Sequence, residues 1–199
     1  MAGVAFFLWC FLVFLLLGVR ALLHWRRTGS FGYRVPNLAG GWRARVGPVL
    51  LASGGLLVGL GPFLLWQGWL KGPFETGLVV EILGCIVALG GTGLTWWAQH
   101  QMGDSWRFGS DSSEEVVLVV SGLFARVRNP IYTADCLAFT GIALLAPHCL
   151  TWIGLGLTLS AFQWQVRVVE EPLMKRLHGE EWRRWAAKTP RFLPWSHGD

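Results

Sequence analysis

The sequence predicts an all-α integral membrane protein with five transmembrane helices. Of its 199 residues, 53% are hydrophobic and only 15% are charged, whereas soluble domains carry about 25% charged residues. The apolar residues also lie in blocks without any charge, over residues 2–17, 46–70 and 82–98. Blocks of about 17–25 apolar residues are what a helix needs to cross a hydrocarbon layer of roughly 30 Å.

Three spans are expected in the first half of the chain, at about Ala2–Leu23, Val46–Trp66 and Leu78–Ala98. No basic residue precedes the first apolar block, and its cations, Arg20, Arg26 and Arg27, follow it. This arrangement is not that of a cleavable leader and predicts a retained first span with its N-terminus outside.

Two shorter apolar runs, about Ile131–Ala146 and Leu150–Trp164, flank the dipeptide Pro147-His148. A proline beside a polar residue between two apolar runs predicts a tight helical hairpin. Each arm is short for a lone span, so we expect the pair to tilt little or to stop short of the far side of the membrane.

The basic residues indicate the orientation of the chain. Residues 20–45 hold six of the 17 Lys and Arg residues, the tail from Arg167 holds seven, and the loop at Lys71 holds one. The positive-inside rule therefore places the tail in the cytoplasm and the Lys71 loop outside. The net charge of +5 follows from this topology and from anionic lipid, and it gives no indication of nucleic acid binding.

The sequence predicts no metal site. Its four cysteines, Cys10, Cys85, Cys136 and Cys149, lack the spacing of a metal or redox motif and lie in or beside apolar runs. They are interpreted as small hydrophobic residues of the membrane core.

The polar segments 99–129 and 167–199 are too short to build a core alone. We therefore expect one membrane domain over residues 1–199, with three spans in 1–100 and a site in 101–199. The two polar segments would pack on each other and on the helix ends in the cytoplasm, with short C-terminal helices covering the pocket between them.

The string R-V-R-N-P-I-Y-T-A-D, residues 126–135, begins the hairpin. Asn129 and Pro130 are typical of the N-cap and first position of a helix. The free N–H groups of a helix start, together with the donors of Arg128, predict a place for an anion. Alternatively, Arg128 binds a lipid phosphate or forms a surface ion pair.

The string R-V-V-E-E-P, residues 167–172, ends the hairpin. Two carboxylates at the end of a membrane helix are costly unless they are paired or solvated. Arg167 lies three and four residues before Glu170 and Glu171, so a local ion pair is available. Pro172 is expected to end the helix or to start the next one, and Gly179 to break the segment that follows. That segment could also be a simple juxtamembrane helix on the headgroups.

These strings, followed by P-R-F-L-P at 190–194, resemble the isoprenylcysteine carboxyl methyltransferase family. The wider group of small membrane methyltransferases includes the phospholipid N-methyltransferases. The resemblance covers the C-terminal half, from about Gly103 to Pro194, and the first two spans match only in kind.

The resemblance implies that S-adenosylmethionine binds in a cytoplasmic pocket roofed by the C-terminal segment. The cofactor-binding residues expected in this way, together with Arg128, are Leu118, Val119, Phe124, Asn129, Pro130, Tyr132, Glu170 and Glu171. Arg167 takes the position of the family's substrate arginine and Glu171 that of its cofactor glutamate, so this pair is expected to be catalytic. Glu170 fits that glutamate equally well.

Two positions depart from the family pattern. Asn129 replaces a histidine and Phe124 replaces a tyrosine. An asparagine can still donate an N–H group to a carboxylate, so cofactor binding remains the expectation. Unlike histidine, it cannot act as a base, so no base is expected at this position. Methyl transfer to an ionised acceptor depends mostly on positioning. The expected acceptor is a lipophilic or lipid-modified carboxylate, thiol or amine that reaches the site among membrane lipids.

Two alternatives stay open. Membrane sterol reductases that use NADPH share this C-terminal architecture, and the end of N-P-I-Y-T-A-D at Asp135 resembles their motif. A family-like membrane protein without activity is the second alternative, because Asn129 and Phe124 depart from the pattern. Binding of S-adenosylmethionine, of NADPH or of neither distinguishes the three.

Overall fold

The structure, a computed structural model, describes residues 1–33, 41–72, 76–106 and 117–194. None of these residues forms a strand, which confirms the predicted all-α class. The helical elements in chain order are α1 (Ala2–Val13), the π turn η1 (Phe14–Val19), α2 (Arg20–Thr28), α3 (Gly41–Trp66), α4 (Leu78–Met102), η3 (Gly103–Ser105), η4 (Gly122–Ala125), α5 (Pro130–Leu145), α6 (Cys149–Trp164), the π turn η5 (Gln165–Glu170) and α7 (Glu171–Ala186).

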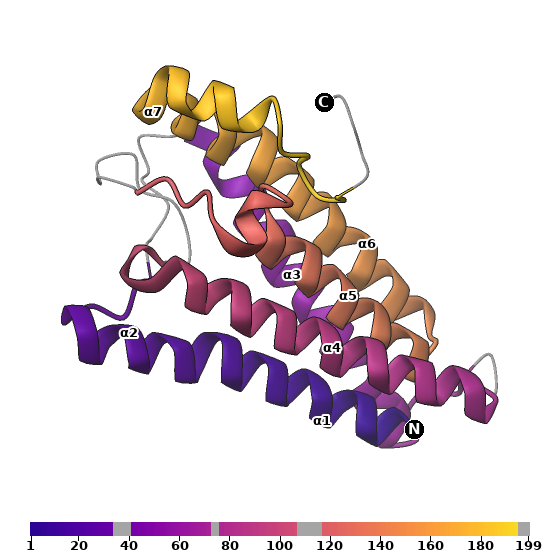
Figure 1. The fold of residues 1–199 in the computed structure, drawn as a ribbon. Coiled ribbons are helices and arrows are strands. Elements are labelled where there is room, and N and C mark those ends of the chain that lie inside the picture. The colour runs from indigo at the N-terminus through magenta and orange to yellow at the C-terminus, as the bar shows by residue number, and fades with distance from the viewer. Residues whose placement is uncertain (34–40, 73–75, 107–116, 195–199) are drawn as a thin grey trace.

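Three helical stretches in the described part of the chain are long and apolar enough to cross a membrane: Ala2–Thr28, Gly41–Trp66 and Leu78–Ser105. They contain the three spans expected in the first half. The predicted hairpin is present, because α5 and α6 have 16 residues each and turn at Ala146, Pro147 and His148. Figure 1 shows this turn at the same end of the bundle as the N-terminus. The count of five spans stays a prediction.

Glycines bring α4 and α5 into backbone contact. A Cβ atom at Gly91 of α4 would lie 2.4 Å from the backbone nitrogen of Ala138, and one at Gly141 of α5 would lie 2.3 Å from that of Ala88. In lipid, helices associate through close approach at small residues. These two contacts therefore fix the depth of α5 relative to α4.

The α3–α6 pair is built in the same way. A Cβ atom at Gly54 would lie 2.6 Å from the Thr158 hydroxyl oxygen, and one at Gly154 would lie 2.7 Å from the backbone nitrogen of Val58. Helix α1 packs against α3, where the Trp9 indole N–H donates to the Gly55 carbonyl oxygen at 3.0 Å. The apolar core lies between the two pairs and α1.

Arg20 links the first span to the end of α4. Its side chain is 2% exposed, and its Nη2 donates to the carbonyl oxygens of Gln99 (3.3 Å) and Gly103 (2.6 Å). The last carbonyl groups of a helix lack partners within it and carry partial negative charge. These carbonyl groups therefore partner one nitrogen of the buried cation, and its guanidinium also lies 4.8 Å from the centre of the Trp106 ring.

One continuous helical stretch joins α6, η5 and α7. Pro172 lies in the first turn of α7, which fits the expectation that it starts a helix, although helical conformation runs from α6 through η5 into α7 without a gap. A proline inside a helix removes one hydrogen bond and crowds the preceding turn, and the π turn η5 directly before it is a local distortion of the kind that accommodates such a residue. The expected break at Gly179 is confirmed, because this residue has φ 51° and ψ −118°.

The helix contact at Gly91 gives a testable prediction. Gly91→Ala places a methyl group against the backbone of α5, so we expect a loss of about 1–3 kcal/mol in unfolding free energy, as for an overpacked core. Unfolding in mixed detergent micelles would measure it. Gly90→Ala is the matched control, because nothing lies within 4 Å of its Cβ position. Equal stability of the two variants would contradict the packing described here.

Candidate functional site

An ion-pair cluster joins the start of α5, the start of α7 and the C-terminal tail. One Glu171 oxygen accepts from Nη1 of Arg128 (2.8 Å) and from Nε of Arg191 (2.9 Å), and the other accepts from Nη2 of Arg191 (2.9 Å). Both arginines are 8% exposed. Charge-assisted bonds of this kind, with one guanidinium bound through two nitrogens, are the strong ones in proteins. The expected helix-start arginine therefore forms a buried ion pair.

The tail is also tied to α5 through its backbone. The Arg128 N–H donates to the Pro190 carbonyl oxygen (2.8 Å), and the Asn129 N–H donates to that of Arg191 (3.1 Å). The Thr133 hydroxyl donates to the Phe192 carbonyl oxygen at 2.8 Å. The tail therefore lies across the N-terminus of α5.

Asn129 differs from its expected role in one respect. It occupies the N-cap position before Pro130, but its side chain makes no capping hydrogen bond. Its amide instead donates to the Arg191 carbonyl oxygen at 3.1 Å. The tail competes for this side chain because its backbone lies directly across the helix start.

The break at Gly179 brings two tryptophans of α7 to the cluster. The Arg128 guanidinium lies 6.0 Å from the centre of the Trp182 ring. The Trp185 indole N–H donates to the carbonyl oxygen of Phe124 at 3.2 Å. Phe124 itself is buried in η4.

A second polar group lies beside the ion pairs. The Tyr132 hydroxyl donates to a Glu170 oxygen at 2.5 Å, and Nε2 of Gln165 lies 3.4 Å from the same oxygen. The Tyr132 ring stacks on Phe162 of α6 with 4.6 Å between the ring centres. Tyr132 and Glu170, which were expected in one site, are therefore in direct contact.

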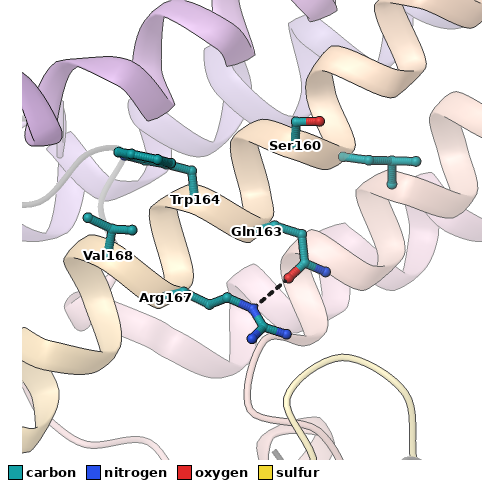
Figure 2. Close-up of a pocket in the computed structure, with 6 residues that line it drawn as sticks. Ser160, Gln163, Trp164, Arg167 and Val168 are labelled. Atoms are coloured by element: carbon teal, nitrogen blue, oxygen red, sulfur yellow. Dashed lines mark hydrogen bonds between the residues drawn. The ribbon is translucent and has the colours of Figure 1, made fainter.

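Arg167 lies one helical turn before Glu171. It is exposed, and its Nε donates to Oε1 of Gln163 at 3.0 Å. The side chains of Arg167 and Gln163 border an open depression of about 410 Å³ along α6 and η5, shown in Figure 2. Its lining is drawn from a single helical stretch: Leu159, Ser160, Gln163, Trp164, Arg167 and Val168.

A second depression of about 410 Å³ lies at the other end of the bundle. It is bordered by Met1, Glu81 and Pro147 among others. These residues belong to the N-terminus, the start of α4 and the α5–α6 turn. It is therefore remote from the ion-pair cluster.

The remaining expected residues have less specific surroundings. Leu118 and Val119 are half-buried in the irregular segment before η4, and Pro130 is buried at the start of α5. Sequence reasoning assigned no role to Arg191, Gln165 or Gln101, whose Oε1 accepts from the Leu123 N–H at 2.9 Å. Arg191 stands inside the quoted P-R-F-L-P string, which was the available signal. The described residues contain no group of three potential metal ligands.

Comparison with known proteins gives one finding. The sequence profile of a family described as phospholipid methyltransferase matches residues 79–181, which is just over half of the chain. The match runs from α4 through most of α7 and includes Arg128, Tyr132, Glu170 and Glu171. No curated protein sequence and no solved structure matches the chain.

The cluster predicts how the tail responds to loss of one charge. Glu171→Gln leaves two buried guanidinium groups without their carboxylate, so we expect the tail to lose about 1.5–3 kcal/mol of local stability. Hydrogen exchange at the backbone of Arg128 and Asn129, which donate to the tail, would measure this loss. Glu180→Gln is the control, because Glu180 pairs with Arg183 and the two side chains are 69% and 54% exposed. Unchanged exchange in Glu171→Gln would contradict the role of the cluster.

Proposed function

Because the chain belongs to the phospholipid methyltransferase family, we propose that it transfers a methyl group from S-adenosylmethionine to a lipophilic acceptor at the membrane–cytosol interface. The observation that carries the proposal is the meeting of α5, α7 and the tail at Arg128, Glu171 and Arg191. The start of α5, the start of α7 and the tail lie at the end of the bundle away from the α5–α6 turn (Figure 1).

The residues of the cluster fit the chemistry of this cofactor. Two guanidinium groups and the start of α5 offer donors to its carboxylate. The Tyr132–Glu170 pair offers an acceptor to its amino or ribose hydroxyl groups. The rings of Tyr132 and Trp182 offer faces for an adenine ring or a cationic sulfonium.

Each residue then has a distinct part in binding. Glu171 acts as a positioning residue, because it holds Arg128 and Arg191 beside the start of α5. Asn129 and Pro130 form that helix start, and Asn129 also holds the tail in place. Leu118, Val119 and Phe124 supply the apolar wall that the family resemblance assigns to these positions.

The acceptor would meet Arg167. This arginine borders the depression on α6 and η5, whose other lining is partly apolar (Figure 2). An amphiphile could place its polar head at Arg167 and Gln163 and its chain along Leu159 and Val168. S-adenosylmethionine supplies a methyl group on a sulfonium, and a carboxylate, thiolate or neutral amine can take it by in-line displacement. The work left to the protein is positioning.

In the proposed topology the chain crosses the membrane five times, with the N-terminus outside and the tail in the cytoplasm. This orientation places the cluster on the cytoplasmic side, where the soluble cofactor is available. The Lys71 loop and the α5–α6 turn would then face the outside. The distribution of Lys and Arg residues supports it.

Ligand titration tests the proposed function. The purified protein in detergent should bind S-adenosylhomocysteine, and NADPH should not compete for the site. Arg128→Ala should weaken binding by about 1.5–3 kcal/mol, the contribution of a charge-assisted bond. Arg167→Ala is the control, since Arg167 lies on the acceptor depression and should leave this affinity unchanged.

Binding of NADPH in place of S-adenosylhomocysteine would replace the proposal with the reductase alternative. Binding of neither ligand by folded protein would favour the non-catalytic alternative. An Arg128→Ala variant that folds and binds normally would remove Arg128 from the site.

Cysteine labelling tests the proposed topology. In a background without the four native cysteines, Lys71→Cys should react with a membrane-impermeant maleimide in intact cells, and Lys188→Cys only after permeabilisation. The expectation follows from the positive-inside rule. Reaction of both positions in intact cells would contradict the topology and the cytoplasmic placement of the cluster.

A further inference from the structure

Asp135 is an ionisable residue within the apolar helix α5. Its Oδ1 accepts a hydrogen bond of 2.7 Å from the hydroxyl of Thr95 on α4. Within the part of the chain that the structure describes, Thr95 is the hydrogen-bond partner found for this carboxyl group, and it is a neutral one. A carboxyl group in a membrane helix is costly and marks a functional position by default.

The contact with Thr95 shows how deep Asp135 lies. Thr95 is in the uncharged block 82–98 of α4, three residues before its end, which is about 4.5 Å along a helix. The backbone contact between Gly91 and Ala138 fixes the two helices against each other at this level. The Asp135 carboxyl group therefore lies just inside the apolar layer on the side of the ion-pair cluster.

The register of α5 shows which way Asp135 faces. Residues three before, four after and seven after it share its side of the helix, and these are Tyr132, Phe139 and Ile142. Phe139 and Ile142 are buried in the core, and Tyr132 contacts Glu170. Asp135 thus lies on the inward side of α5, one turn deeper than the Tyr132–Glu170 pair.

The hydrogen-bond partners of Asp135 and Glu171 differ in charge. Two guanidinium groups already neutralise Glu171, whereas the contact of Asp135 is a hydroxyl group. A carboxylate at the edge of a low-dielectric layer interacts strongly with a nearby cation. A ligand that brings a positive charge to this depth would be stabilised there.

We propose that Asp135, positioned by Thr95, is the carboxylate that faces the sulfonium charge of bound S-adenosylmethionine. The inference rests on the proposed function and names the place of methyl transfer. The methyl group is presented at the α4–α5 contact, just inside the apolar layer, one turn below the groups that hold the polar parts of the cofactor.

Comparison of two ligands that differ by this charge tests the inference. Asp135→Asn should raise the Kd of S-adenosylmethionine about tenfold and leave that of S-adenosylhomocysteine, a neutral thioether, within about twofold. Thr95→Val should shift the same ratio in the same direction by a smaller factor. Asp104→Asn, at an exposed position beyond α4, is the control and should leave both constants unchanged. Calorimetry in lipid nanodiscs measures all of them without turnover.

An unchanged ratio in folded Asp135→Asn would overturn the inference, and so would a shift seen with Glu170→Gln but not with Asp135→Asn. Should Asp135→Asn fail to fold, an unchanged ratio in Thr95→Val would overturn it instead. Wild-type protein that binds neither ligand would overturn the proposed function, and the inference with it. Binding of S-adenosylhomocysteine with no effect of Asp135 on the ratio would leave the proposed function standing.

Discussion

The carboxylate of Glu171 joins three separate parts of the chain, namely α7, the start of α5 and the tail. Its bonds to Arg128 and Arg191 are buried, so removal of any one partner leaves the others desolvated and unbalanced. The backbone bonds between residues 128–129 and 190–191 then align the tail with the helix start. The relative position of the start of α5, the start of α7 and the tail depends on this link.

Close contacts between helices position the elements that carry the Glu171 ion pairs. Glycines allow α4 to touch α5 and α3 to touch α6 at the backbone, and α6 continues through the π turn η5 and Pro172 into α7. The hairpin therefore delivers the start of α5 and the start of α7 to the same end of the bundle. The break at Gly179 returns Trp182 and Trp185 to that place. Local backbone features thus bring distant polar residues together.

The sequence predicted what depends on local pattern. Long uncharged blocks predicted the three long helices, Pro147-His148 predicted the hairpin, and Gly179 was expected to break α7. It could not predict pairings between residues far apart in the chain: Glu171 is 43 residues from Arg128 and 20 from Arg191. Asn129 matched an N-cap by type, but the tail takes its side chain. Pro172 was expected to end a helix or to start one, and it lies in the first turn of α7, but nothing in the sequence predicts the π turn η5 before it.

The central claim is that the groups at the start of α5, the start of α7 and the tail form one cofactor site. Direct photo-crosslinking with S-adenosylmethionine labelled at its methyl group, followed by peptide mapping, tests it most directly. The account predicts label in residues 117–135 or 170–192, and loss of that label when S-adenosylhomocysteine is added. Label confined to the first two spans, or label that S-adenosylhomocysteine does not displace, would contradict the account.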